Sequence, residues 1–244
     1  MKNKKSIFPN IVTTLNILSG FMALALASDG HYVFSAYFIF IAAIFDLLDG
    51  IVARLLKTSS DYGVQLDSLS DTISFGAAPA LLMYNVALKE YGVLGILISS
   101  LLLIFGILRL ARFNTQIESL VVKSDFKGLP IPLSALTVAS FILMFPEKGV
   151  PTEPLNLLVI PLIVVLSLLM VSNIPYSAFP KLKMATIKEN PVMLLFILYS
   201  FAVLYFTRNY GLFIVFITLI IFGILKYFYL KITGSKEEEI DFEN

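Results

Sequence analysis

The sequence predicts an all-α protein, a polytopic membrane bundle of about eight transmembrane helices. Apolar residues make up 58% of its 244 residues and charged residues only 14%, and the mean hydropathy is +0.87. A water-soluble domain of this composition would expose large apolar patches, so a lipid bilayer is the expected surroundings. The apolar residues also gather in long runs, and about 20 such residues in a helix cross a bilayer.

The apolar runs follow one another with short polar connections between them. In chain order the predicted spans are 11–27, 33–48, 66–88, 93–110, 129–145, 157–171, 192–206 and 212–230. The basic start MKNKKS resembles the start of a signal peptide, but more apolar spans follow and no cleavage pattern leads into a soluble domain. Pro175, Pro180 and Pro191 separate the sixth span from the seventh, because proline interrupts helices. An even number of spans places both termini on one side.

The basic residues are distributed unequally between the two sides of these spans. If the N-terminus is cytoplasmic, 15 of the 18 lysines and arginines lie on the cytoplasmic side, and Lys89, Lys148 and Arg208 lie opposite. This is the positive-inside pattern. We therefore predict a protein of the cell (inner) membrane with both termini in the cytoplasm. The net charge of +1 gives no reason to expect a nucleic-acid partner, and the absence of cysteine excludes disulfides and thiolate metal sites.

Four aspartates stand where membrane helices normally avoid charge. The second span ends with IFDLLDGIVAR and the third begins with DYGVQLDSLSDTISFG. Ionisable residues inside the membrane are costly and indicate function. Asp46 and Asp49 are three residues apart, and Asp67 and Asp71 are four apart, so each pair occupies one face of its helix. The sequence predicts two carboxylate pairs that face each other across a helical hairpin.

Four carboxylates in one place repel each other unless a cation joins them. Oxygen ligands without nearby histidine or cysteine suit a hard ion, and four of them are enough for two Mg²⁺ or Mn²⁺ ions. The small residues Gly50, Ala53 and Gly63 fall on the same helical stripes and leave room beside the acids. Small residues also let membrane helices pack closely. Arg54 follows Gly50 by one turn, where it can reach a bound diphosphate or extend to the membrane surface.

These residues together resemble the signature of the CDP-alcohol phosphatidyltransferases. The matching pattern is Asp46-x2-Asp49-Gly50-x2-Ala53-Arg54-x8-Gly63-x3-Asp67-x3-Asp71. The resemblance covers about the first six spans. It implies that residues 1–176 are the family's six-helix membrane core and that 177–230 add a cytoplasmic loop and two more helices. The charge run KEEEIDFEN predicts that 231–244 are a disordered charged tail.

The resemblance also implies a reaction, in which an alcohol attacks the lipid-bearing phosphorus of a CDP-linked lipid and expels CMP. Asp46, Asp49 and Asp67 are then expected as metal ligands, and Asp71 as both a ligand and the catalytic general base. The residues expected to line the CDP pocket are Gly50, Ala53, Arg54 and Gly63, with Asn10 and Thr13 from the first span. Asn10 and Thr13 share a helix face with Asn16, and hydrogen bonding between helices explains these three polar residues equally well. A homodimer is expected from the family alone.

Four separated segments resemble the phosphatidylserine synthase branch of this family. They are DSLSDTISFGAAP (67–79), FPNIVTTLN (8–16), RLARFN (109–114) with FKGLPIP (126–132), and MVSNIPY (170–176). This branch implies CDP-diacylglycerol and L-serine as substrates and CMP as a product. Arg109, Arg112 and Asn114 are candidates for holding serine, because arginine pairs with carboxylates in a bidentate way. The positive-inside bias explains the two arginines equally well. Ser172 and Asn173 are expected to cap a helix or bond helices, and His31 has no expected role.

Other functions fit parts of this pattern. A related enzyme with another acceptor, giving archaetidylserine, glycerol-phosphate or inositol-phosphate products, would share the aspartates. An ion-coupled transporter also places aspartates in a membrane. The transporter is disfavoured because the acids lie at the cytoplasmic ends of adjacent spans and no inverted repeat is visible.

Overall fold

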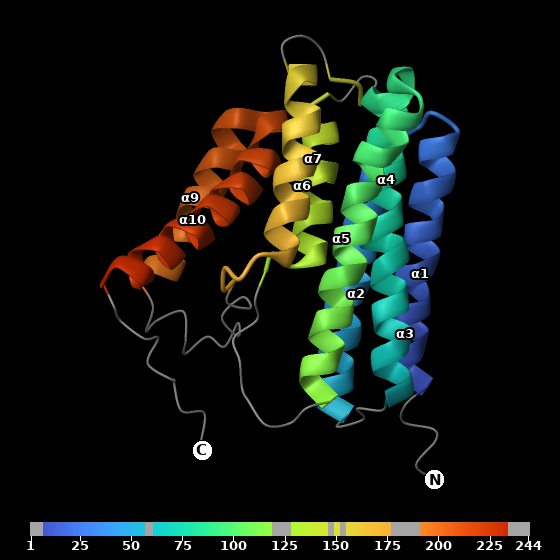
Figure 1. Cartoon of the computed structure of the whole chain (residues 1–244). Helices are drawn as coiled ribbons and strands as arrows, with labels where there is room; N and C mark the ends of the chain where they lie inside the picture. The colour runs from blue at the N-terminus through green and yellow to red at the C-terminus, as the bar shows by residue number, and fades with distance from the viewer. Residues whose placement is uncertain are drawn as a thin grey trace.

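The computed structural model describes residues 7–56, 61–118, 128–145, 149–151, 155–176 and 191–233. Within these ranges the chain is helical and has no strand, which confirms the all-α prediction. A helix or a continuous helical run corresponds to each predicted span (Figure 1), although the helix in the fifth span is shorter than the predicted 129–145. The predicted loop at 177–190 lies outside the described residues, as do residues 234–244 of the predicted tail. Residues 231–233 are not part of a tail, because they form the end of the last helix.

Seven α-helices match seven of the predicted spans. They are α1 (Ile7–Ser28), α2 (Tyr32–Leu56), α5 (Val93–Glu118), α6 (Ile131–Leu143), α7 (Val159–Val171), α9 (Pro191–Thr207) and α10 (Gly211–Thr233). The start of α1 and the end of α10 lie toward the same end of the bundle (Figure 1), as an even number of spans requires.

The third predicted span is a helical run of changing type. It consists of α3 (Asp61–Asp71), a π-helical segment Thr72–Ala77, α4 (Ala78–Met83) and a second π-helical segment Tyr84–Leu88, before a 3₁₀ turn at Lys89–Tyr91. π-Helical turns are rare and often occur at functional sites. The sequence prediction placed the span but did not foresee these irregular turns.

Four helical stretches of the described chain are long and apolar enough to cross a membrane. They are Pro9–Ser28, Tyr32–Leu56, Val93–Thr115 and Leu194–Thr233, the last of which contains both α9 and α10. By contrast, α6 and α7 have 13 residues each. At about 1.5 Å per residue they are roughly 20 Å long, shorter than a hydrocarbon core of about 30 Å.

The N-terminal helices α1 and α2 form an antiparallel pair, and the third run lies beside α1. At one end of this group, the Ser35 hydroxyl of α2 donates to the Ala23 carbonyl of α1 at 2.8 Å. Near the same end, the Asn85 amide donates to the Ala27 carbonyl at 3.3 Å. Hydrogen bonds of this kind hold membrane helices together, since lipid gives little hydrophobic drive for their association.

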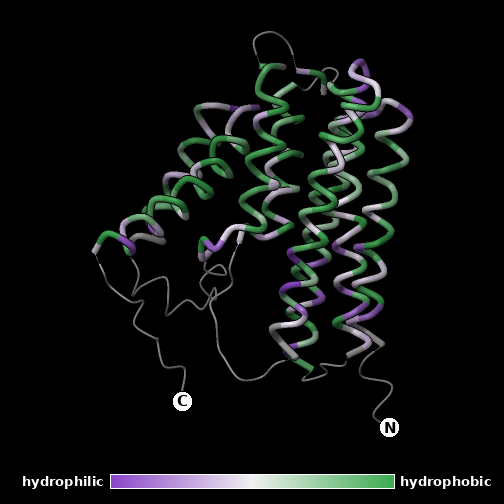
Figure 2. The backbone as a smooth tube through the Cα atoms, in the orientation of Figure 1, coloured by the Kyte–Doolittle hydropathy of each residue, from purple (hydrophilic) through white to green (hydrophobic). Residues whose placement is uncertain are grey.

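Helix α6 lies at the centre of the bundle, between α2, α7 and α10. Phe141 of α6 has no exposed surface, and its ring lies 5.4 Å from the Phe213 ring of α10, measured between centroids. Large apolar side chains such as Leu55 and Phe206 are instead exposed on the outside, where a bilayer would cover them. Figure 2 shows apolar residues along most helices and hydrophilic residues toward the lower ends of α2, α3 and α5.

Tyr176, which follows α7, joins the core to the last helical pair. Its hydroxyl donates to the Ile220 carbonyl of α10 at 3.3 Å. Burial raises the pKa of Tyr176 to about 12, so the hydroxyl keeps the proton that it donates. A Cβ atom on Gly223 would lie 2.4 Å from the Tyr176 ring, so α10 needs glycine there. This contact seats α10 against the core.

Candidate active site and its aspartates

The structure brings the four aspartates together between α2 and α3. One carboxylate oxygen from each of Asp46, Asp49 and Asp67 lies within 4.8 Å of the other two. The side chain of Asp71 lies within hydrogen-bonding reach of Asp46. The predicted pairs therefore face each other across the two helices, as the helical spacing requires.

Two of the four aspartates are buried and two are half-buried, and their carboxyl groups are incompletely paired. Asp49 is 6% exposed and Asp71 is 7% exposed. Within the described part of the chain, Oδ2 of Asp49, Oδ1 of Asp67 and Oδ1 of Asp71 are buried without a hydrogen-bond partner. Burying charged oxygens without partners is costly, and so is placing four acids together. The oxygen-only donor set, its close spacing and its unpaired atoms all fit hard divalent cations such as Mg²⁺ or Mn²⁺.

The residues expected to line a nucleotide pocket lie on α1, α2 and α3, the helices that pack together around this cluster. The Thr13 side chain of α1 lies within hydrogen-bonding reach of the Asp49 carboxyl group, although its hydroxyl also donates to the Pro9 carbonyl at 3.1 Å. Asn10 lies one turn before Thr13 and is half-buried. Ala53 and Gly63 are partly buried on α2 and α3, within one turn of an aspartate.

Arg54 is exposed, and its guanidinium folds back over Gly50. A Cβ atom on Gly50 would lie 3.9 Å from both terminal nitrogens of Arg54. A guanidinium therefore stands one turn beyond the aspartates of α2, beside a helix surface that glycine keeps open. This arrangement suits an anionic diphosphate, which would bind the arginine directly and the aspartates through cations.

Comparison with known proteins identifies the family of this site. The family model described as CDP-alcohol phosphatidyltransferase matches residues 6–172. The chain belongs to the CDP-alcohol phosphatidyltransferase family. The matched range includes every residue of the aspartate signature and ends at the last turn of α7.

Three relatives within this family show which branch the chain resembles. A CDP-diacylglycerol–serine O-phosphatidyltransferase of Helicobacter pylori is 36% identical over 231 residues, which are 94% of each chain. An archaetidylserine synthase of Methanothermobacter thermautotrophicus is 38% identical over 185 residues, 72% of this chain and 74% of its own. A CDP-diacylglycerol–serine O-phosphatidyltransferase of Methanocaldococcus jannaschii is 40% identical over 169 residues, 69% of this chain and 73% of its own.

Arg109 and Asn114, two of the three candidates for holding the acceptor, face the aspartate helix from α5. The Arg109 guanidinium is close enough to Asp71 for electrostatic attraction, and its Nε is buried without a described hydrogen-bond partner. The Asn114 amide nitrogen donates to the Ser68 hydroxyl of α3 at 2.9 Å. Its Oδ1 is buried and has no partner among the described residues.

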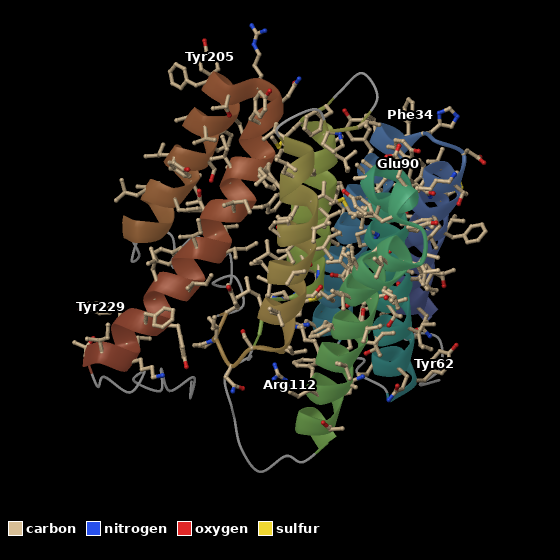
Figure 3. The ribbon with its side chains drawn as sticks, turned by 45° about the horizontal axis from the view of Figure 1, so that its top comes forward. Phe34, Tyr62, Glu90, Arg112, Tyr205 and Tyr229 are labelled. Atoms are coloured by element: carbon tan, nitrogen blue, oxygen red, sulfur yellow. The ribbon has the colours of Figure 1, made fainter. Side chains whose placement is uncertain are left out.

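Arg112, the third candidate, is directed to a different place. Its Nη1 donates to the Val171 carbonyl at 3.1 Å and its Nη2 donates to the Ser172 carbonyl at 3.2 Å. Figure 3 shows Arg112 between α5 and the end of α7. Carbonyls at a helix end lack partners within the helix, so a cation there stabilises α7. The bonds of Arg112 hold the fold together at this end of α7.

The segments RLARFN, FKGLPIP and MVSNIPY meet at this place, a pairing that sequence reasoning missed. The Gly128 amide donates to the Ile174 carbonyl at 2.8 Å, and the Leu129 amide donates to the Leu169 carbonyl at 2.9 Å. We call Arg112, Gly128 and residues 169–174 the α7 junction. The shared resemblance of the three segments to one branch was the only signal in the sequence that could have grouped them. Ser172 caps α7 as expected, since its hydroxyl donates to the Leu169 carbonyl at 2.8 Å.

Proposed function

We propose that this protein transfers a phosphatidyl group from CDP-diacylglycerol to the hydroxyl of L-serine, which gives phosphatidylserine and CMP. The observation that carries the proposal is the convergence of four aspartates, three of them with buried unpaired oxygens, in a chain of this family. The names of the relatives support serine as the acceptor, because the enzymes from Helicobacter pylori and Methanocaldococcus jannaschii are both named for it. Membership in this family does not fit an ion-coupled transporter.

All four aspartates are assigned to the metal site, and Asp71 is also assigned as the base. Asp46, Asp49 and Asp67 would hold divalent ions together with Asp71. Two such ions, Mg²⁺ or Mn²⁺, would neutralise the diphosphate and stabilise the charge that develops on departing CMP.

The chemical step needs a proton acceptor beside the serine hydroxyl. Asp71 takes the proton from that hydroxyl, whose oxygen then forms a bond to the lipid-bearing phosphorus. The bond between this phosphorus and the CMP oxygen breaks, and CMP leaves with the electron pair. Asp71 suits this role because it is the aspartate that lies near Arg109 on α5, on the side where the acceptor candidates stand.

Arg109 and Asn114 are the residues we assign to the acceptor. Serine at neutral pH carries a carboxylate and an ammonium group. The Arg109 guanidinium would pair with the carboxylate, and the unpartnered Asn114 Oδ1 would accept a hydrogen bond from the ammonium group. Arg112 is already bonded to α7, which leaves fewer cations for an acceptor that carries a phosphate group. This arrangement supports serine over glycerol phosphate or inositol phosphate.

The lipid part and the surroundings of the enzyme are further parts of the proposal. Both phosphatidyl and archaetidyl synthases occur among the relatives, and we propose diacylglycerol as the lipid because the relative that covers 94% of the chain is named for it. The unequal distribution of basic residues supports an active site on the cytoplasmic face of the cell membrane. A homodimer stays a prediction.

The test uses membranes that contain the expressed protein. They receive Mn²⁺ or Mg²⁺, CDP-diacylglycerol or CDP-archaeol, and in parallel labelled serine, glycerol phosphate or inositol phosphate. We expect label from serine to enter phosphatidylserine, with release of CMP. Incorporation from another acceptor but not from serine would refute the acceptor, and a preference for CDP-archaeol would refute the lipid.

The role of Asp71 is tested by Asp71→Asn, which replaces one carboxylate oxygen by an amide nitrogen and removes the proton acceptor. We expect turnover to fall by a factor of about 10² to 10⁴, the usual contribution of general-base catalysis. The variant should still insert into membranes and elute as a folded protein. Near-normal turnover would exclude Asp71 as the base.

A further inference from the structure

Asn16 of α1 is a buried polar residue whose hydrogen-bonding groups are not paired within the described structure. It has no exposed surface, and within the described part of the chain neither its Nδ2 nor its Oδ1 has a hydrogen-bond partner. Leaving a buried polar group unpaired costs about 1 to 3 kcal/mol. Most buried polar groups are paired with protein, with ordered water or with an ion, so Asn16 calls for such a partner.

The register of the helices shows which part of the site Asn16 adjoins. Thr13 of α1 reaches Asp49 of α2, and the two helices run antiparallel. Moving forward by three residues on α1, from Thr13 to Asn16, therefore corresponds to moving back by three on α2, from Asp49 to Asp46. Residues three apart share a helix face, so Asn16 points the same way as Thr13.

Hydrogen bonds from the third helical run to α1 lead to the same placement of Asn16. The Ser70 hydroxyl donates to the Thr13 carbonyl at 3.4 Å, and the Ser74 hydroxyl donates to the Asn16 carbonyl at 3.0 Å. Asp71 follows Ser70 directly, so its backbone falls between the levels of Thr13 and Asn16. Asn16 thus lies one turn further into the bundle than Thr13, at the backbone level of Asp46 and close to that of Asp71. We call this level the inner edge of the aspartate cluster.

Both Asp71 of α3 and Asn16 of α1 carry buried polar atoms that have no described partner. Oδ1 of Asp71 is buried without a described partner, as are both polar atoms of Asn16. A primary amide offers two donors and one acceptor. A water molecule held by a divalent cation needs an acceptor for its protons, and the carboxylates that hold the cation need donors for their remaining oxygens. An amide supplies both.

We infer that Asn16 forms the inner wall of the metal site and positions its ligands. Its amide would hydrogen-bond to a carboxylate oxygen of the aspartates and to a water molecule of the hydrated cation. Asn16 is a positioning residue in this account, since it acts on substrate only through the aspartates. The inference rests on the metal ions of the proposed function and does not depend on which alcohol is the acceptor.

The principal test replaces Asn16 by leucine, which has a similar size and no polar atoms. The purified full-length protein in detergent is titrated with Mn²⁺, and bound Mn²⁺ is followed by electron paramagnetic resonance together with the melting temperature. We expect Asn16→Leu to melt without metal at the same temperature as the wild type or higher, because an unpaired buried amide is lost. Its half-saturating Mn²⁺ concentration should rise by about 10- to 100-fold, as for other residues that orient metal ligands.

A second variant, Asn16→Asp, keeps the shape and adds a fifth carboxylate. We expect it to be less stable than the wild type without metal, because the acids repel each other, and to regain that loss when Mn²⁺ is added. The control is Ser167→Ala on α7, since the Ser167 hydroxyl is also buried without a described partner but lies on a helix that carries none of the aspartates. Its Mn²⁺ titration should equal that of the wild type.

The outcomes separate this inference from the proposed function. Equal Mn²⁺ affinity in the wild type and Asn16→Leu would overturn the role of Asn16 and leave the metal site intact. A wild-type protein that binds no Mn²⁺ would overturn both the metal site and the inference. A large loss of melting temperature in metal-free Asn16→Leu would show that the amide is paired within the fold, and would also overturn the inference.

Discussion

Gly128 is the residue at which we expect a single methyl group to disturb the fold most clearly. It stands just before α6 with a φ of +88°, and its amide donates to the Ile174 carbonyl at 2.8 Å. A Cβ atom there would lie 2.1 Å from the Met170 carbonyl oxygen and 3.0 Å from Nη2 of Arg112. Gly128→Ala therefore forces either the end of α7 or the start of α6 to move.

Two contributions set the expected size of the effect. A residue other than glycine held at such a positive φ costs about 1 to 3 kcal/mol. Forcing a methyl group into a packed place costs about another 1 to 3 kcal/mol, since a carbonyl oxygen on a helix cannot turn aside as a flexible side chain can. The sum is a loss of about 2 to 6 kcal/mol.

Gly30→Ala separates these two contributions. Gly30 has a φ of +83°, nearly that of Gly128, and a Cβ atom on it would have nothing within 4 Å. Gly30→Ala should lower the free energy of unfolding only by the conformational cost, about 1 to 3 kcal/mol. Melting curves of the two variants in the same detergent give the comparison, and Gly128→Ala should melt several degrees lower, at about 2 to 4 °C per kcal/mol for a chain of this size. Equal melting temperatures would refute the close approach of residue 128 to the Met170 carbonyl.

Two further substitutions test other contacts. Arg112→Lys keeps the charge but loses the planar guanidinium that donates to two carbonyls, so it should lower the melting temperature. The KM for serine should rise less in Arg112→Lys than in Arg109→Lys. A larger rise in Arg112→Lys would instead assign Arg112 to the acceptor site. Gly20→Ala places a Cβ atom 2.2 Å from the Ser74 hydroxyl and 2.7 Å from the Ser74 Cα. Gly20→Ala should lower the free energy of unfolding, measured by calorimetry or chemical denaturation, by about 1 to 3 kcal/mol. An unchanged stability would mean that α1 and the third run are not in close contact there.

The positions of the four aspartates could be predicted because helix geometry is local. Spacings of three and four residues bring side chains to one face whatever the rest of the chain does. That the two pairs face each other followed from interpreting the second and third spans as a helical hairpin. Only the family resemblance separated Asp71 from the other aspartates, since nothing in the spacing distinguishes a base from a ligand.

The division between Arg109 and Arg112 could not be predicted, because it depends on where distant segments return. The two arginines are three residues apart on one helix. Arg112 is bonded by carbonyls at Val171 and Ser172, about 60 residues later in the chain, while Arg109 lies near Asp71, about 40 residues earlier. A sequence pattern gives the face of a helix but not the neighbour that covers it. The same limit applies to Asn16, whose buried and unpaired state appears only when the bundle is assembled.

The third helical run shows how packing and chemistry use the same residues in this bundle. Ser68, Ser70 and Ser74 form hydrogen bonds with Asn114 of α5 and with two carbonyls of α1. Between lipid-facing helices such bonds and small residues provide much of the association, since apolar burial drives it weakly. These serines alternate with Asp67 and Asp71 along the run, so the bonds that dock the run also fix where its carboxylates stand. A serine-to-alanine change here would therefore move the aspartates as well as loosen the fold, whereas an equivalent change on α7 would affect the fold alone.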